Sequence, residues 1–493
     1  MKAIKIQPDF ANLSNPEVII NHIESLKKES AAIPHTEILQ KLLKEVQPVD
    51  FYSLVPADEL GKNGSIPLRH VQVLSVENVL QLAEQNRWGL CKNEDFIYLY
   101  NGTYWLQIDK EHFQKFLGEA AEQMGVAKFS ARFYQFREQL FKQFLATAYL
   151  PTPESDKDTV LINLKNGTFE ITKTGTELRP FDGSDFITYQ LPFEYNPKAT
   201  APIFTAFLDR VLPDKDSQQV LAEYLGYIFI KHGSRLKLEA ALILYGSGAN
   251  GKSVFFEIVN AMLGNENVSS YSLQELTDNT GYYRAMVANK LVNYASEING
   301  KLEVNYFKRM VSGEPVPARL PYGKPMQLKQ YAKFIFNCNE LPKDVEHTNA
   351  FFRRWVIIPF EVTIPKDEQD SELHNKIIDK ELSGVFNWVL DGLHRLLKQK
   401  KFTKSIAVQK AVEQYRLESD SVQMFLTDFE YKTSATEETK LKDLFTEYRT
   451  YCIDSGFRAC SLKTFSDRLK NLGFVAERKS YGMAVNAVKN NNY

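Results

Sequence analysis

One short segment limits the possible folds of this chain more than any other. Residues 246–253 read Gly-Ser-Gly-Ala-Asn-Gly-Lys-Ser and fit the pattern G-x-x-x-x-G-K-[ST]. An apolar, strand-like run at 241–245 leads into them, an apolar helical stretch at 254–263 follows, and Gly264 is placed to end that helix. In such a unit, glycines let the backbone approach phosphate oxygens, while N–H groups and the positive end of the helix point at the anion. The segment therefore predicts a nucleoside triphosphate site.

The residues of this loop have separate expected tasks. Lys252 would reach the β- and γ-phosphates of the nucleotide, and the Ser253 hydroxyl would bind Mg²⁺. The residues expected to line the nucleotide are Gly246, Ser247, Gly248, Ala249, Asn250, Gly251, Lys252 and Ser253.

Two alternatives compete with a triphosphate site. One is a chance match to the pattern. The other is a dinucleotide fold, because Gly246, Gly248 and Gly251 also fit G-x-G-x-x-G. That fold requires an acidic residue at the end of a second strand about 20 residues further on. Only Glu266 is available, and it precedes the possible strand, so the sequence favours the triphosphate site.

Three further apolar runs, at 290–295, 333–336 and 355–360, alternate with helical stretches and predict a largely parallel sheet flanked by helices. Glu297 follows the first run and is expected to orient or deprotonate the attacking water; it is also a candidate metal ligand beside Ser253. Asn339 follows the second run and could bond the γ-phosphate or the water. Arg353 and Arg354 precede the third run and suit phosphate oxygens. Each residue also has an ordinary structural explanation. Glu297 could be an exposed acid at a strand end, Asn339 could be a turn asparagine, and the arginines could form a surface ion pair.

Composition narrows the classes of partner. The 60 Lys and Arg against 61 Asp and Glu exclude a strongly basic surface, so nucleic acid would have to bind local patches. Four cysteines without a C-x-x-C pair predict reduced thiols, not a zinc site or disulfides. The start of the chain lacks the apolar core of a signal peptide, and no apolar run of about 18 residues exists. We expect a soluble, intracellular protein without a membrane partner.

The last part of the chain, residues 431–493, reads as two helices followed by a hairpin, which predicts a winged helix. Its 11 basic and 7 acidic residues give a net charge of +4. A DNA-binding and a protein-binding role both fit that modest charge. The residues expected to contact DNA are Lys463, Arg468, Lys470, Arg478 and Lys479.

Several motifs occur in a fixed order along the chain and carry a resemblance to a known family. They span residues 163–167, 191–197, 225–227, 245–253, 295–297, 307–319, 336–342, 352–355 and 358–360. In these motifs the sequence resembles superfamily 3 helicases, in particular the phage and plasmid primase–helicase group related to the poxvirus-type nucleoside triphosphatase. The resemblance implies a multi-domain α/β protein with an AAA+-like P-loop core.

The resemblance also implies an activity. It implies a replicative DNA helicase of a mobile element, which forms a ring, depends on ATP and Mg²⁺ and moves 3′ to 5′. Such a helicase would act in the cytoplasm of a bacterial host. Such a protein forms a homo-hexamer and acts on single-stranded and forked DNA. Lys252 and Ser253 would bind nucleotide and Mg²⁺, Glu297 would be the catalytic carboxylate and Asn339 the sensor. Arg354 would be the arginine finger, with Arg353 as the alternative.

The family places a hairpin that enters the ring channel between the positions of Glu297 and Asn339. Residues 316–329 have a turn-like centre here. Arg319, Lys324 and Lys329 could follow phosphates, and Tyr322 could stack on a base. The alternative is a solvated hairpin with incidental cations.

The expected domains are an N-terminal α+β region at 1–110, a family-specific domain and helical collar at 111–234, the ATPase core at 235–400, a helical linker at 401–430 and the winged helix at 431–493. Residues 1–110 lack the pair of aspartates, one residue apart on an apolar strand, that a primase would use to hold metals. Priming is therefore expected from a separate protein. The alternative function is a P-loop NTPase that remodels proteins or loads onto DNA without unwinding it.

Overall fold

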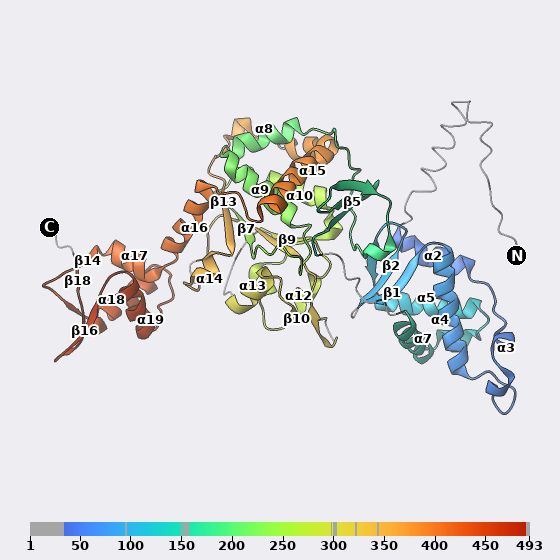
Figure 1. Cartoon of the computed structure of the whole chain (residues 1–493). Coiled ribbons are helices and arrows are strands. Elements are labelled where there is room, and N and C mark those ends of the chain that lie inside the picture. Colours follow the sequence, from blue (N-terminus) through green and yellow to red (C-terminus); the bar gives the residue numbers. More distant parts are fainter. Residues whose placement is uncertain are drawn as a thin grey trace. The chain divides into compact units, whose positions relative to one another are not determined.

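The computed structural model describes residues 34–93, 96–148, 150, 157–296, 298, 303–320, 323–342 and 345–489. The chain divides into two compact units (Figure 1). Unit 1 comprises residues 1–155 and 180–188, and unit 2 comprises residues 156–179 and 189–493. The boundary expected at residue 110 differs from this division, because it falls at the start of a helix whose Phe113, Phe116 and Leu117 are buried in the core of unit 1.

Unit 1 packs helices against a small antiparallel sheet of order β1-β2-β3. The strands are β1 (Gly89–Asn93), β2 (Phe96–Tyr100) and β3 (Trp105–Ile108). The helices are α2 (His35–Glu45), α3 (Phe51–Leu54), α4 (Leu68–Gln85), α5 (Lys110–Gln123), α6 (Lys128–Arg132) and α7 (Tyr134–Thr147), with the short 3₁₀ helices η2 (Ala57–Glu59) and η3 (Gly183–Asp185). Asp109 caps the start of α5, because its carboxylate accepts a hydrogen bond from the N–H of His112.

The segment 180–188 returns to unit 1 from later in the chain. The backbone N–H of Trp105 donates to the Ile187 carbonyl at 2.8 Å, and the Trp105 indole donates to the Gly183 carbonyl at 2.8 Å. The Phe186 ring lies 5.1 Å from the Tyr98 ring and 5.3 Å from the Trp105 indole, between centroids. These contacts make residues 180–188 part of the aromatic packing of unit 1.

Unit 2 is built around the parallel sheet that the sequence predicts. Its strand order is β13-β7-β12-β9-β8, and all paired strands are parallel. The strands are β7 (Ala241–Tyr245), β8 (Val268–Ser269), β9 (Val292–Ala295), β12 (Lys333–Cys338) and β13 (Trp355–Pro359). Ala241, Leu242, Ile243 and Leu244 are fully buried, as expected for a central strand covered on both faces.

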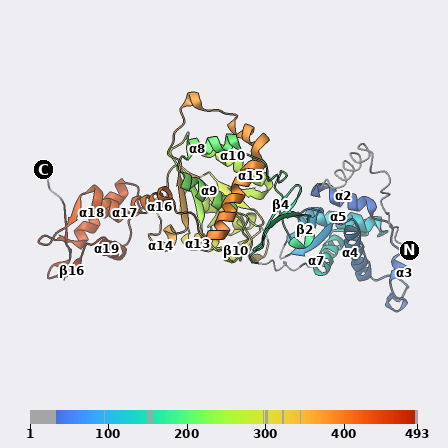
Figure 2. The same ribbon diagram turned by 45° about the horizontal axis from the view of Figure 1, so that its top comes forward.

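Helices surround this sheet, and α9, α10 and α15 gather on one face of it (Figures 1 and 2). The helices are α8 (Pro202–Val211), α9 (Lys215–Tyr227), α10 (Lys252–Leu263), α11 (Leu273–Leu276), α12 (Tyr282–Met286), α13 (Val304–Val311), α14 (Asn349–Phe352), α15 (Leu373–Gln399) and α16 (Ile406–Glu418), with η4 (Asn265–Asn267) and η5 (Lys366–Glu368). At the crossing of α9 and α15, a Cβ on Gly392 would lie 2.4 Å from the Ala222 carbonyl carbon. Helices α8 and α9, expected in a separate collar, instead pack against α15 of the core.

Two smaller antiparallel sheets complete the middle of the chain. The first is formed by β4 (Val160–Leu164), β5 (Gly167–Ile171) and β6 (Thr176–Arg179), and the second by β10 (Val316–Arg319) and β11 (Pro325–Leu328). The second is the hairpin expected at 316–329, with Arg319 opposite Pro325.

The C-terminal part contains the expected pair of helices and the hairpin. Its helices are α17 (Ser421–Asp428), α18 (Leu441–Asp454) and α19 (Leu462–Asn471), and its strands are β14 (Tyr431–Thr433), β15 (Thr439–Lys440), β16 (Ala476–Lys479), β17 (Gly482–Val485) and β18 (Ala487–Lys489). Phe425, Tyr448 and Phe465 are central to its buried core. In the described ranges, no helix is both long and apolar enough to cross a membrane. All four cysteines are free thiols, and three are buried.

Candidate nucleotide-binding site

The loop between β7 and α10 is tied on both sides to neighbouring strands. The N–H of Gly246 donates to the Cys338 carbonyl of β12 at 3.1 Å, and the Asn250 amide donates to the Phe360 carbonyl after β13 at 2.9 Å. The N–H of Ile364 donates to the Ala249 carbonyl at 2.8 Å. These bonds fix the loop at the carboxyl edge of the sheet. The strand order changes direction around β7, and such edges are where open α/β sheets bind ligands.

Glycine is required at particular positions of this loop. A Cβ on Gly246 would lie 2.2 Å from the Asn250 amide nitrogen and 2.3 Å from the Phe360 carbonyl oxygen. Gly248 and Gly251 have φ angles of +112° and +85°, which side chains disfavour, and Ala249 adopts the left-handed region at +50°. The loop thus has the curled backbone that directs N–H groups toward an anion. A Cβ on Gly251 would lie 2.8 Å from a Val211 methyl group and 2.9 Å from the Phe207 ring, so α8 packs close to the loop, which no local sequence pattern indicated.

Lys252 lies at the first position of α10 and is almost fully buried. Its ammonium donates to the Gly246 carbonyl at 2.6 Å and to the Asn250 side-chain oxygen at 3.1 Å. Burial lowers the pKa of this ammonium. Both of these acceptors are neutral, so they satisfy the hydrogen bonds of the cation without cancelling its charge. An oxyanion in the loop would supply the missing countercharge.

Three other predicted residues belong to the same edge. Ser253 is exposed at the second position of α10, and Asn339 is exposed directly after β12. Cys338 and Pro359 both align with Tyr245, and Phe336 aligns with Ala295, so the strand ends meet at the loop. Glu297 lies outside the described residues. The structure therefore brings the loop, Ser253 and Asn339 to one edge of the sheet.

The two neighbouring arginines occupy different environments. Arg354 is buried; it donates to the Ala350 carbonyl at 2.6 Å and the Ser312 hydroxyl at 2.9 Å, and it lies 3.1 Å from the Glu239 carboxylate. Arg353 is exposed and approaches the same carboxylate at 3.3 Å. Burial opposes ionisation of Glu239, but Lys237 and the two arginines outweigh it and lower its pKa. Sequence reasoning missed Glu239, whose position shows no local motif.

The predicted DNA-contact residues fall into two groups. On the β10–β11 hairpin, Arg319, Lys324 and Lys329 are exposed, whereas Tyr322 lies outside the described residues. The Arg319 guanidinium donates to the Gly323 carbonyl at 3.1 Å, a bond across the end of the hairpin.

In the C-terminal part, the five cations predicted to contact DNA differ in their exposure and in their pairing with acids. Lys463, Lys470 and Arg478 are exposed. Arg468 lies 3.3 Å from the Asp420 carboxylate, and Lys479 lies 2.8 Å from Glu438 and 3.3 Å from Glu477. Two of the five charges are therefore already paired with acids of the same chain.

Comparison with known proteins identifies two family matches. Residues 80–213 match the family described as "D5 N terminal like", and residues 244–354 match a family of unknown function, DUF5906. The second match includes the phosphate loop, Asn339 and both arginines.

Among individual proteins, the chain is 25% identical over 353 residues to "Putative helicase L207/L206" of Acanthamoeba polyphaga mimivirus, covering 64% of this chain and 35% of that protein. It is 23% identical over 344 residues to "Putative helicase 121R" of Invertebrate iridescent virus 3, covering 61% and 36%. The C-terminal region of NrS-1, in its apo form, aligns at 11% identity with a TM-score of 0.43, over 83% of this chain and 98% of that one. The chain spans about a third of the length of the two viral relatives. Over most of its own length, it is similar to viral proteins named as helicases.

Proposed function

We propose that the chain binds ATP with Mg²⁺ and hydrolyses it at the edge of the five-stranded sheet. The observation that carries this proposal is the Lys252 ammonium, held by neutral oxygens inside a preformed glycine loop. The loop and the first turn of α10 would hold the phosphates, and Ser253 would ligate Mg²⁺. Glu297 would activate the water, and Asn339 would sense the γ-phosphate.

We further propose that hydrolysis drives unwinding of DNA, as in a superfamily 3 helicase of the primase–helicase type. The match to a D5-like family and the similarity to proteins named as helicases support this reading. The exposed cations of the β10–β11 hairpin would contact single-stranded DNA. The C-terminal part would act as a winged helix on duplex DNA, chiefly through Lys463, Lys470 and Arg478.

The chain would act as a ring of six identical copies, as the family resemblance implies, with an arginine completing the site of a neighbour. We assign that finger to Arg353, because Arg354 is buried and bonded to Ser312, whereas Arg353 is exposed and shares the Glu239 carboxylate with Lys237 and Arg354. An arginine finger stabilises the charge of the transition state and accelerates phosphoryl transfer by several orders of magnitude. Isolated copies would therefore be slow ATPases.

The test is the ATPase rate per chain as a function of protein concentration, with and without single-stranded DNA, followed by strand displacement on a forked duplex. The proposal expects the rate per chain to rise with concentration and with DNA, and unwinding to require Lys252. A full rate at the lowest concentration would contradict assembly. A DNA-independent ATPase without strand displacement would favour the protein-remodelling or DNA-loading alternative.

A further inference from the structure

Helix α12 and the β10–β11 hairpin form one body beside the sheet. The N–H of Arg319 in β10 donates to the Gly281 carbonyl, directly before α12, at 3.2 Å. Gly281 has a φ of +77° and lies against Ala318 and Pro317 of the hairpin. The hairpin is therefore joined by its backbone to the start of a helix that comes earlier in the chain.

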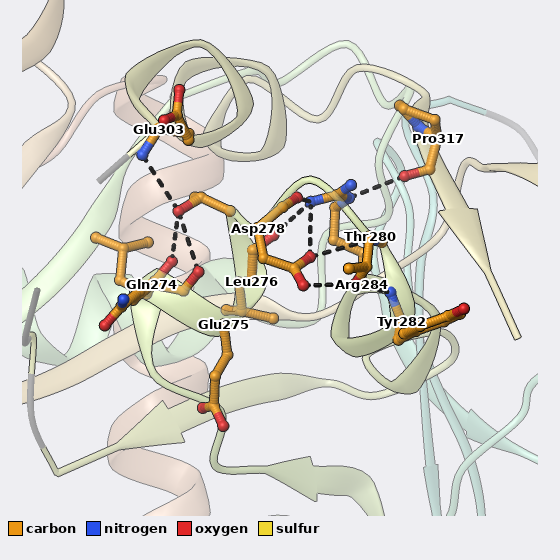
Figure 3. A network of polar contacts seen from close by, with 12 residues as sticks. Gln274, Glu275, Leu276, Asp278, Thr280, Tyr282, Arg284, Glu303 and Pro317 are labelled. Carbon is orange, nitrogen blue, oxygen red and sulfur yellow. Dashed lines mark hydrogen bonds and ion pairs between the residues drawn. The ribbon is translucent and has the colours of Figure 1, made fainter. Parts of the chain in front are cut away.

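The buried side chain of Arg284 in α12 connects the helix to the β10–β11 hairpin (Figure 3). Only 1% of this residue is exposed. Its guanidinium donates to the Pro317 carbonyl of β10 at 2.8 Å, to the Leu276 carbonyl at 3.0 Å and to the Asp278 carbonyl. It also lies 4.1 Å from the centre of the Tyr306 ring of α13. A planar group with five donors can bridge several elements in this way, which a lysine cannot reproduce.

The network extends toward the chain that follows β9. The Thr277 hydroxyl accepts a hydrogen bond from the N–H of Glu303, which precedes α13, at 3.4 Å (Figure 3). Arg284 and Thr277 thus connect the hairpin to the helix that follows the segment containing Glu297.

The outer face of α12 carries large apolar side chains in solvent. Tyr282, Tyr283 and Met286 are 36%, 39% and 43% exposed, although α12 is only five residues long. Figure 3 shows the Tyr282 ring extending away from the polar network. The Tyr283 ring is braced by Tyr271, at 5.4 Å between centroids. Two exposed rings next to a basic hairpin, one of them supported by a second ring, have the composition of a surface that stacks unpaired bases.

The charge around these rings favours a polyanion. Arg319 and Lys324 are exposed. The nearby acid, Asp278, accepts hydrogen bonds from the Gly281 N–H at 3.0 Å and from the Thr280 hydroxyl, and lies 3.7 Å from Arg284. Its negative charge is therefore compensated by Arg284 and would not repel phosphates.

We propose that α12 is a second part of the single-stranded DNA contact, in which Tyr282 and Tyr283 stack on bases while Arg319 and Lys324 contact phosphates. Arg284 is a positioning residue that holds the rings in register with the hairpin. This inference rests on the proposed function, because it requires the chain to bind single-stranded DNA. The inference goes beyond the proposed function because it places contacts to DNA bases on a helix outside the hairpin.

The experiment measures binding of the full chain to a fluorescent oligo-dT at several salt concentrations. The double variant Tyr282→Ala and Tyr283→Ala should bind at least about fivefold more weakly, with an unchanged slope of affinity against salt, because stacking releases no counterions. Lys324→Ala should reduce that slope by about 1. Tyr52→Ala, at a tyrosine of unit 1 that is 62% exposed, is the control and should have no effect.

Arg284→Gln tests the positioning role. It should weaken binding to oligo-dT as much as the double tyrosine variant does, while binding of a fluorescent ATP analogue stays unchanged. Equal loss of both activities would mean that Arg284 is only structural. Failure of the wild-type chain to bind oligo-dT would overturn the proposed function itself. Wild-type binding that the double tyrosine variant retains in full would overturn only the present inference, and would leave the exposed rings to a protein partner.

Discussion

The phosphate loop and the C-terminal part were both expected to bind phosphate through cations, but the structure holds those cations differently. In the loop, Lys252 contacts the neutral oxygens of Gly246 and Asn250. In the C-terminal part, Arg468 and Lys479 contact the carboxylates of Asp420 and Glu438. A neutral acceptor orients a cation and leaves its charge available, whereas a carboxylate cancels it. The kind of acceptor, more than the number of basic residues, decides which region is ready to receive an anion.

Two buried cations of unit 2 extend this comparison. Arg354 contacts the Glu239 carboxylate and is neutralised like the C-terminal cations. Lys333, the first residue of β12, contacts the neutral Nδ1 of His232 at 3.1 Å and lies 4.4 Å from the centre of the Tyr227 ring. Like Lys252, it is almost fully buried and has a neutral acceptor, and burial lowers its pKa to about 7. A neutral acceptor therefore leaves the charge of a buried lysine uncancelled, but it does not remove the cost of burying that charge.

The largest expected effect is that of Lys252→Ala. Removing the one cation that the loop holds without a described countercharge should lower ATP affinity and hydrolysis by about 100-fold or more. Fluorescent-nucleotide binding and phosphate release measure this. Lys173→Ala is the control, because its ammonium already pairs with the Asp158 carboxylate at 2.7 Å. Similar losses of ATP affinity and hydrolysis in Lys252→Ala and Lys173→Ala would contradict the special role of a cation held by neutral acceptors.

Substitutions of Arg354 and Arg353 should have different effects, the first mainly on stability and the second mainly on ATP hydrolysis. Arg354→Ala removes the buried donor to the Ser312 hydroxyl and one of the cations beside Glu239, and it should lower the free energy of unfolding by about 2 kcal/mol. Arg353→Ala should change it by less than about 1 kcal/mol, yet reduce hydrolysis by the assembled protein by about 1,000-fold. Denaturation curves and ATPase assays at high protein concentration test both. An active Arg353→Ala variant would exclude the finger role.

Lys333 predicts a pH dependence of stability. In the unfolded chain a lysine keeps its ordinary pKa of about 10.4, so above about pH 7 the unfolded state binds more protons than the native one. The cost of burying Lys333 is therefore full below about pH 7 and is relieved as the pH rises, by up to about 1.4 kcal/mol per pH unit. Lys333→Met should remove this rise in the free energy of unfolding, measured from about pH 6 to about pH 9. Identical pH profiles of the two proteins would contradict the assignment.

The smallest expected effect is that of Glu438→Gln. Removing this carboxylate leaves Lys479 with only the longer contact to Glu477 among its described acids, and should tighten binding to duplex DNA about twofold and steepen its salt dependence. Lys479→Ala alone should change little, whereas Lys463→Ala should weaken binding. Fluorescence anisotropy with a duplex oligonucleotide distinguishes these outcomes. If Lys479→Ala lost as much affinity for duplex DNA as Lys463→Ala, pairing with acids would not reduce the contribution of a cation to DNA binding here.

The sequence predicted those features that depend on local residue order. The glycine loop, the parallel sheet and the C-terminal pair of helices follow from short-range patterns, whereas the β10–β11 hairpin was expected from the family resemblance. The assignment of Arg354 as the finger did not anticipate its burial, because Glu239 lies more than a hundred residues earlier and meets it only in the fold. The Arg284 network escaped prediction for the same reason: its acceptors Leu276 and Pro317 are backbone carbonyls, which carry no sequence signal.

The return of residues 180–188 to unit 1 has a consequence for anyone who wishes to divide this chain. A fragment that stops at residue 155 would lose Phe186 and the carbonyls that bond Trp105, and would leave the aromatic side of its sheet open to water. A single proteolytic cut before residue 180 would not release unit 1 cleanly, because part of its interior would remain attached to the other fragment. The natural modules of this protein are therefore interleaved along the sequence, and a truncation that respects the fold must keep both pieces.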